Sequence, residues 1–183
     1  MRIIAGALGG RRIDSPPGRG TRPTSDRVRE ALFSALGPLD GMLVIDLYAG
    51  SGALGLESLS RGAASVLFVE KHPGALRVLR QNVNVLGLEE RARVVAADVA
   101  RGPRGEPSPA DLLLVDPPYD LLRRPRFVEG LAGWMTPERL ADDARMVLEH
   151  ARRDAPPELP LMGPARRSRR YGDTVLSFYR RID

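Results

Sequence analysis

The glycine-rich turn in residues 44–55 restricts the fold of this chain more than any other segment. A short apolar run, residues 43–47, leads into Tyr-Ala-Gly-Ser-Gly-Ala-Leu-Gly, and a stretch of helical spacing follows. Gly50, Gly52 and Gly55 allow a sharp turn and a close approach to a ligand, and the first amides of the helix can bind it. A strand that enters a helix in this way predicts an α/β sheet with a ligand site at one edge.

The rest of the chain alternates between short apolar runs and segments of helical period, the pattern of a mostly parallel sheet covered by helices. We expect strands at residues 43–47, 65–69, 93–96, 112–115 and 145–148, and helices that end at Leu36, Arg61 and Leu86. We expect a hairpin around Gly9-Gly10, a surface loop at residues 101–110, and a closing hairpin from residues 166–171 and 174–180.

The acidic residues around the glycine turn favour a cationic cofactor. Asp46 lies at the end of the first strand, where a buried carboxylate needs a cationic or hydrogen-bonding partner. S-adenosylmethionine carries an ammonium group and a sulfonium, whereas a pyrophosphate would be repelled. Glu70 and Asp98 end the next two strands and can accept from ribose hydroxyls and an adenine amino group. We therefore expect S-adenosylmethionine, whose product is S-adenosylhomocysteine, and no metal ion. The expected cofactor-binding residues are Asp46, Gly50, Ser51, Gly52, Glu70 and Asp98.

A second motif, Asp116-Pro117-Pro118-Tyr119, directly follows the fourth expected strand. The prolines fix φ and lack N–H groups, so the Asp116 carboxylate and the Pro117 carbonyl can both accept from a planar exocyclic amine such as guanine N2. Tyr119 can stack on the base, an interaction worth roughly 1–3 kcal/mol. Hydrogen bonding to Asp116 favours the pyramidal nitrogen that attacks a methyl group, so alignment and electrostatics carry the catalysis. We expect these four residues to form the catalytic site.

Positive charge is concentrated at the two ends of the chain. Of the 28 basic residues only Lys71 is a lysine, so 27 are arginines. Residues 1–29 carry a net charge of +5 and residues 164–183 a net charge of +4, which leaves −4 on the segment between them because the total is +5. Arginine forks match phosphate geometry, so the ends suggest a polyanion footprint, although a solvated surface has the same composition. The candidates for phosphate contacts are Arg11, Arg12, Arg22, Arg27 and Arg29, although Arg27 or Arg29 could instead pair with acids of the body, and lining a cofactor entrance is a third role.

The composition excludes several classes of protein. There are no cysteines, so disulfides, thiolate zinc sites and cysteine nucleophiles are excluded. The hydrophobic share of 43% and the charged share of 28% are those of a globular chain. No apolar run approaches the roughly 20 residues that span a bilayer, and the first residues lack the apolar core of a signal peptide. We expect a cytoplasmic protein with no membrane contact.

Together these segments resemble the RsmD family of bacterial 16S rRNA guanine-N2 methyltransferases, which are class I S-adenosylmethionine-dependent enzymes. The resemblance includes residues 2–6, 21–33, 46–55, 116–119 and 171–174, and so covers nearly the whole chain. It implies an α/β, Rossmann-like, seven-stranded, mostly parallel sheet with a C-terminal antiparallel hairpin and a small N-terminal β-hairpin extension.

The resemblance also carries expectations about domains and partners. Residues 1–36 are expected to form a basic extension of hairpin and helix, and residues 37–183 a single methyltransferase domain. The implied substrate is 16S rRNA in small-subunit particles or assembly intermediates. We expect the protein to be a monomer.

Other functions fit parts of the same sequence. DNA adenine-N6 and protein glutamine methyltransferases also place an acceptor, two prolines and an aromatic residue after the fourth strand, but they more often carry Asn at the position of Asp116. Only 43 residues precede Val44, which leaves little room for the target-recognition domain usual in the DNA enzymes. The pattern Gly50-x-Gly52-x-x-Gly55 also occurs in nicotinamide oxidoreductases. A non-catalytic RNA-binding module with this fold is a further alternative.

Overall fold

A computed structural model of the protein describes residues 1–16, 25–103, 109–124 and 126–182. Its elements in chain order are α1 (Asp26–Leu36), β1 (Leu43–Leu47), α2 (Ala53–Ser60), β2 (Ser65–Glu70), α3 (Pro73–Leu86), β3 (Ala92–Ala96), η1 (Val99–Arg101), β4 (Ala110–Val115), η2 (Leu121–Arg123), α4 (Phe127–Ala132), β5 (Leu140–Ala151), β6 (Arg167–Tyr171) and β7 (Thr174–Arg180). Strands and helices alternate through β4, as the sequence pattern predicts.

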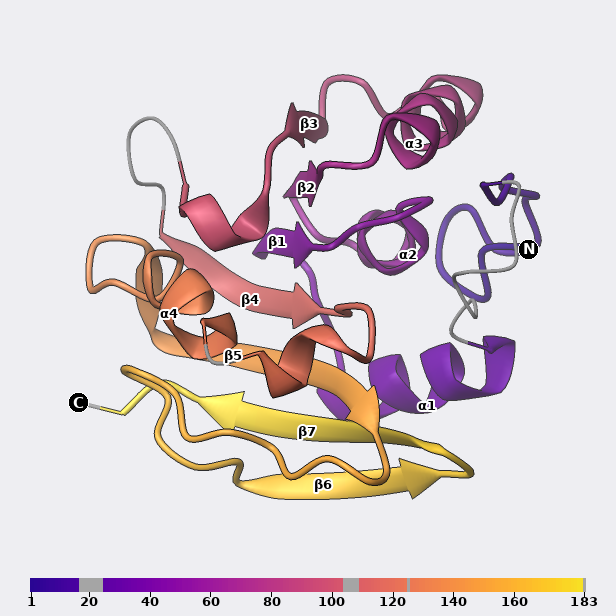
Figure 1. Ribbon diagram of the computed structural model, residues 1–183. Helices are drawn as coiled ribbons and strands as arrows, with labels where there is room; N and C mark the ends of the chain where they lie inside the picture. The colour runs from indigo at the N-terminus through magenta and orange to yellow at the C-terminus, as the bar shows by residue number, and fades with distance from the viewer. Residues whose placement is uncertain (17–24, 104–108, 125, 183) are drawn as a thin grey trace.

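All seven strands form one sheet in the order β3-β2-β1-β4-β5-β7-β6 (Figure 1). The first five strands run parallel, whereas β7 is antiparallel to both β5 and β6. The predicted seven-stranded α/β sheet with a C-terminal antiparallel hairpin is confirmed. The chain moves outward from β1 to β3 and then returns to β4 on the other side of β1, so the strand order reverses between β1 and β4. Ligands of open α/β sheets bind at such a reversal, beyond the carboxyl ends of the strands.

The two faces of the sheet are covered by different elements, as Figure 1 shows for α2 and α3 on one side and α4 on the other. Alternate strand residues point to opposite faces. Val44 and Phe68 therefore pack in the core with α1, α2 and α3, whereas Ile45 and Val69 pack in the core with α4. Trp134 is fully within the second core, and its indole nitrogen donates to the carbonyl of Val99 at 3.0 Å. Both faces of the central strands are buried, which explains their nearly continuous apolar sequence.

The N-terminal segment, residues 1–16, lies against the C-terminal half of α2. Where a β-hairpin is expected, the structure has a single antiparallel bridge between Arg2 and Arg12 rather than two strands. The backbone amides of Ile4 and Ala5 donate instead to the buried carboxylate of Glu57, at 2.7 and 3.1 Å. Backbone hydrogen bonds still pair residues 1–3 with residues 10–13, and the bonds to Glu57 fasten the paired segment to α2.

The last parallel strand is much longer than the sequence pattern indicates. We expect residues 145–148, but β5 runs from Leu140 to Ala151. Pairing with β7 extends from Arg145 to Ala151, so the antiparallel partner prolongs the strand past its apolar centre into Glu149 and His150. Among the residues described, no helix is long and apolar enough to cross a membrane.

Candidate active site

Four acidic residues gather at the carboxyl edge of the sheet. Asp46 lies within β1 and Glu70 ends β2, while Asp98 follows β3 and Asp116 follows β4. Because β1 is flanked by β2 and β4, Asp46 lies between the strands that carry Glu70 and Asp116. The strand reversal between β1 and β4 therefore lies directly between Asp46 and Asp116, and the predicted clustering of acids is present.

The glycine loop between β1 and α2 is held by two of these acids. The amide of Gly50 donates to Oε2 of Glu70 at 2.9 Å, and the amide of Gly55 donates to Oδ2 of Asp46 at 2.9 Å. Asp46 thus binds the first turn of α2, where the backbone amides have no partner within the helix and therefore favour a carboxylate. The loop conformation is left-handed at Tyr48, with φ of 63°, as well as at Gly50.

The glycines of the motif have different structural roles. A Cβ atom at Gly50 would have no neighbour closer than 4.0 Å, so the space beside Gly50 is open to a ligand. A Cβ atom at Gly52 would lie 2.4 Å from Leu79, and one at Gly55 would lie 2.2 Å from the ring of Phe68. The second and third glycines therefore permit α2 to pack closely on α3 and the sheet, and only the first leaves room at the loop surface.

Asp46 is almost completely buried, with 1% of its surface exposed. Burial, the largest influence, and the negative charges of Asp116 and Glu70 together raise the pKa of Asp46 to about 8, although the hydrogen bond from Gly55 opposes the shift. Because burial penalises the charged form, Asp46 is expected to hold its proton near neutral pH. A positively charged ligand at this place would favour the ionised form.

Glu70 joins the glycine loop to the start of α3. Its Oε1 atom accepts from the amides of Lys71 at 2.8 Å and His72 at 2.7 Å, in addition to the bond that Gly50 donates to Oε2. A carboxylate has about four acceptor positions, so three backbone bonds leave capacity for a ligand hydroxyl. Glu70 can therefore shape the loop and still accept from a ribose.

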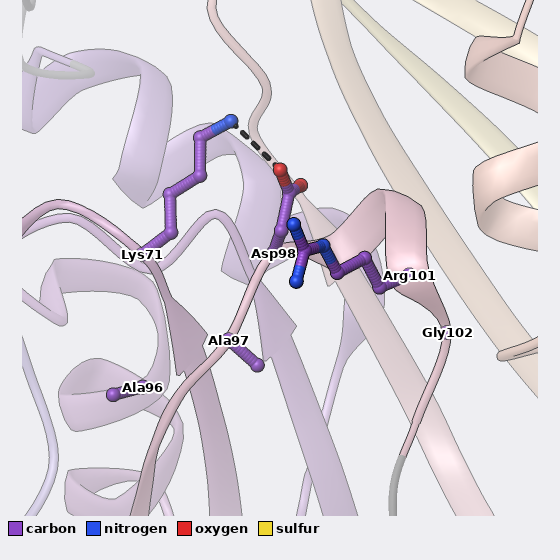
Figure 2. Close-up of a pocket in the computed structure, with 6 residues that line it drawn as sticks. All are labelled: Lys71, Ala96, Ala97, Asp98, Arg101 and Gly102. Atoms are coloured by element: carbon purple, nitrogen blue, oxygen red, sulfur yellow. Dashed lines mark hydrogen bonds and ion pairs between the residues drawn. The ribbon is translucent and has the colours of Figure 1, made fainter.

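A cavity of about 200 Å³ lies next to Asp98, between the end of β3 and η1. Figure 2 shows the side chains of Lys71 and Arg101 on either side of Asp98. The ammonium group of Lys71 lies 3.1 Å from Oδ2 of Asp98, and the amide of Ala100 donates to Oδ1 at 3.1 Å. Burial, the largest influence, raises the pKa of Asp98, but these hydrogen bonds outweigh it and hold the pKa below its usual range. Asp98 is therefore a charged acceptor at the rim of a cavity.

Tyr48 belongs to the same part of the site. Burial raises the pKa of its phenol to about 12, and the charge of Asp98 contributes to the rise. The phenol therefore stays protonated at neutral pH and can act as a hydrogen-bond donor near the cavity. The sequence gives one signal for Tyr48, since an aromatic residue stands inside a glycine turn, but its left-handed backbone could not be read from it.

The predicted catalytic motif, residues 116–119, lies across the strand reversal from Asp46. Pro117 is buried, Pro118 is exposed, and Asp116 and Tyr119 are half-buried. The hydroxyl groups of Tyr119 and Thr174 lie 2.9 Å apart and share a hydrogen bond. Thr174 begins β7, so the C-terminal hairpin fixes the tyrosine ring of the motif. Sequence reasoning did not identify Thr174, because only the fold brings the start of β7, which pairs with the end of β5, within reach of the loop that follows β4.

Asn82 is a second residue that the sequence analysis missed. It lies on the buried side of α3 with 3% of its surface exposed. Its side-chain nitrogen donates to the carbonyls of Ser51 and Asp14, both at 3.0 Å, and its oxygen accepts from the amide of Asp14 at 2.8 Å. Asn82 therefore ties the glycine loop to the N-terminal segment. The signal was a polar residue in the otherwise apolar stripe of that helix.

The predicted phosphate-binding arginines do not form one group. Arg11, Arg12 and Arg27 are exposed, and Arg22 lies outside the described residues. Arg29 is fully buried, and one of its nitrogens donates to Asp26 at 2.7 Å and to the carbonyl of Arg2 at 2.8 Å. The prediction that Arg29 contacts phosphate is wrong for this conformation, because its guanidinium joins α1 to the N-terminal segment instead.

No group of three or more His, Asp or Glu side chains with the geometry of a metal site occurs in the described ranges. Asp46 and Glu70 accept from backbone amides, and Asp98 pairs with Lys71.

The strand order and the acids at the sheet edge define the fold of a class I methyltransferase. The fold is shared with solved structures: yhhF from Escherichia coli has a TM-score of 0.81 at 34% identity, with 99% of this chain and 97% of that chain covered. An RNA methyltransferase from Salinibacter ruber, solved in complex with S-adenosylhomocysteine, has a TM-score of 0.64 at 15% identity, with coverage of 88% and 95%.

The chain belongs to the family described as conserved hypothetical protein 95, whose model matches residues 1–180. It is also 34% identical over 187 residues to Ribosomal RNA small subunit methyltransferase D of Escherichia coli K12, a match that covers 99% of this chain and 90% of the relative. The resemblance to the RsmD family is thereby confirmed over nearly the whole chain.

Proposed function

We propose that this protein transfers a methyl group from S-adenosylmethionine to the exocyclic N2 of a guanine in 16S rRNA of the small ribosomal subunit. The observation that carries the proposal is the position of Asp116 and Tyr119 across the strand reversal from Asp46 and the open side of Gly50. A base beside Asp116 and a cofactor beside Gly50 would meet at this reversal. Membership of the family and the name of the Escherichia coli relative support an rRNA substrate.

The residues of the sheet edge fit the proposed cofactor. When bound, S-adenosylmethionine supplies a methyl group activated by a positively charged sulfur. Asp46 is the buried acid whose ionised form needs a cation, and Glu70 has remaining acceptor capacity for ribose hydroxyls. Asp98 stays charged at the rim of the 200 Å³ cavity, where it can accept from an adenine amino group. The open space beside Gly50 admits the ligand to the loop.

The residues of the second motif would position the target base. Tyr119 provides a stacking surface whose orientation is fixed by its hydrogen bond to Thr174. Asp116 accepts a hydrogen bond from the amine and stabilises the positive charge that develops on the nitrogen as it attacks. The buried Pro117 restricts the backbone and keeps this carboxylate in place. Alignment and charge stabilisation, rather than a strong base, would account for the rate.

Small-subunit particles from cells that lack this protein provide the test substrate. Incubation with S-adenosylmethionine labelled in its methyl group should give label in guanine of 16S rRNA, and mass mapping should place it on N2. Label at another base or on ribosomal protein would refute the proposed target. Label in neither RNA nor protein would refute the activity.

Two variants separate catalysis from binding. Asp116→Ala should abolish methyl transfer while the affinity for S-adenosylhomocysteine, measured by calorimetry, stays within a few-fold of wild type. Asp120→Ala is the matched control, because Asp120 is a nearby exposed acid that pairs only with the exposed Arg124 in the described chain. Equal activity of Asp116→Ala and wild type would assign the motif a structural role only.

A further inference from the structure

A basic groove of about 360 Å³ lies at the sheet end opposite the active site, between the C-terminal end of α1 and strands β5, β6 and β7. Four arginines line it, and no acidic residue does: Arg145, Arg166, Arg167 and Arg180. Arg166, Arg167 and Arg180 are exposed, and Arg145 is half-buried. Nothing in the proposed reaction requires positive charge at this place.

Strand register shows how far this groove is from the catalytic motif. Arg145 pairs with Arg180 at one end of β7, whereas Thr174, which binds Tyr119, stands at the other end. Arg180 lies six positions after Thr174 in the extended strand, a distance of about 20 Å at roughly 3.3 Å per residue. The groove is therefore separate from the site for the target base.

Two of the arginines are held in place by the end of α1. Arg145 donates to the carbonyl of Leu36 at 2.7 Å, and Arg167 donates to the carbonyl of Ala35 at 3.0 Å. The guanidinium of Arg167 also lies 4.6 Å from the centre of the Phe178 ring. These bonds use only some of the five donors of each guanidinium. The remaining donors are pre-positioned, which lowers the entropy cost of binding an anion.

The charge of the groove is not neutralised within the described residues, where no carboxylate forms an ion pair with any of its four arginines. Other arginines of the same C-terminal region do find acids, since Arg181 lies 3.2 Å from Asp142. Arg169 continues the positive charge along β6 toward the active-site end, because it lies two residues after Arg167 and so faces the same side of the sheet. The groove and Arg169 together form a basic track.

We propose that this groove binds the phosphate backbone of the RNA substrate, about 20 Å from the nucleotide that is methylated. The inference depends on the proposed RNA substrate and adds a second contact region to it. Planar guanidinium groups on a rigid sheet match phosphate oxygens in geometry and charge. A protein partner would need acidic side chains in the same arrangement, and this remains the alternative outcome of the test.

The test removes the two arginines that do not bind α1. In the double variant Arg166→Gln/Arg180→Gln, two charges are lost while the contacts to Ala35 and Leu36 stay. The matched control is Arg77→Gln/Arg80→Gln, which removes two exposed arginines from α3 at the far edge of the sheet. The probe is a fluorescein-labelled single-stranded segment of 16S rRNA, and its dissociation constant is measured by anisotropy over a series of salt concentrations. Unfolding midpoints verify that both variants are folded.

Loss of two phosphate contacts should make the slope of log K against log salt shallower by about 1.4, since each contact to a single strand contributes about 0.7. At 0.1 M salt this corresponds to a roughly 25-fold weaker affinity than wild type. The control should retain the wild-type slope, and Arg166→Lys/Arg180→Lys should restore it in part. An unchanged slope in the Gln variant would overturn the proposal and leave a protein as partner. RNA binding is measured without methyl transfer, so a failure of the proposed reaction would be seen separately.

Discussion

Replacement of Gly55 by alanine tests whether the third glycine of the motif serves packing rather than the ligand. The new Cβ would lie 2.2 Å and 2.7 Å from two ring atoms of Phe68 and 2.9 Å from a methyl group of Val66. Carbon atoms in ordinary contact are about 3.5–4.0 Å apart, so the overlap exceeds about 1 Å. Phe68 has 0% and Val66 1% of its surface exposed, so neither side chain can move into solvent.

The expected loss of stability is the difference between two effects. Insertion of a methyl group into a packed core costs about 1–3 kcal/mol, and the severe overlap here indicates the upper end of that range. Alanine within α2 gains about 1 kcal/mol over glycine from helix propensity. The net loss is about 2 kcal/mol, which should lower the unfolding midpoint by roughly 4–8 °C in a domain of this size.

Gly50→Asn should weaken cofactor binding more than it lowers stability, the opposite of Gly55→Ala. Asparagine tolerates the left-handed backbone that Gly50 adopts, and the nearest atom to the new Cβ is 4.0 Å away. Its unfolding midpoint should therefore change less than that of Gly55→Ala, whereas its side chain fills the space that we assign to the cofactor. Affinity for S-adenosylhomocysteine, measured by calorimetry, should fall at least tenfold, or about 1.4 kcal/mol.

A second substitution, Phe68→Leu, should rescue Gly55→Ala. Phe68→Leu removes the ring atoms that the alanine meets, so the double variant Gly55→Ala/Phe68→Leu should be more stable than the sum of the two single changes allows. A midpoint of Gly55→Ala within 1 °C of wild type, or strict additivity with Phe68→Leu, would refute the packing role of Gly55.

Three further predictions follow from single contacts. The free energy of unfolding should fall as the pH rises from about 4 to about 8, because folded Asp46, with its pKa of about 8, keeps a proton that the unfolded carboxyl has released. When this free energy is measured by urea titration at several pH values, its decrease with pH should be smaller for Asp46→Asn than for wild type. Tyr119→Phe removes the hydroxyl that bonds to Thr174 but keeps the ring, so its KM for RNA should rise less than that of Tyr119→Ala, which should rise roughly 5- to 150-fold with the loss of stacking; equal KM values would argue against stacking. Asn82→Ala leaves buried backbone groups unpaired and should cost about 1–3 kcal/mol in thermal unfolding, whereas the exposed Asn84→Ala, the control, should cost little.

Local sequence signals were sufficient for the central part of the fold. Gly87 after α3 and Pro73 at its start mark a helix whose predicted bounds agree with the structure, because both residues act within one turn of the chain. The edge acids Glu70 and Asp98 were found for a similar reason, since each ends a short apolar run. Parallel strands place such ends together without any long-range information beyond the alternation of strands and helices.

Contacts between distant segments were not predictable in the same way. The length of β5 depends on β7, and the orientation of Tyr119 depends on Thr174, 55 residues later in the chain. An arginine is usually exposed, yet Arg29 is buried. Its burial is possible because Asp26 and the carbonyl of Arg2 accept hydrogen bonds from its guanidinium. In each case the outcome depends on a partner that only the folded arrangement supplies.

The two basic ends of the chain form two separate regions of the structure. The basic N-terminal segment is attached to the glycine loop through Asn82, which binds both Asp14 and Ser51. The basic C-terminal segment instead forms the groove beside Arg180, about 20 Å from the catalytic motif by strand length. Helix α1 joins these two basic regions, because Arg29 near its start binds the carbonyl of Arg2, and Ala35 and Leu36 at its end accept from two arginines of the groove. Under the proposed function, the phosphates of an RNA strand can therefore follow these basic regions, and only the target base, which carries no charge, has to enter the acidic carboxyl edge of the sheet.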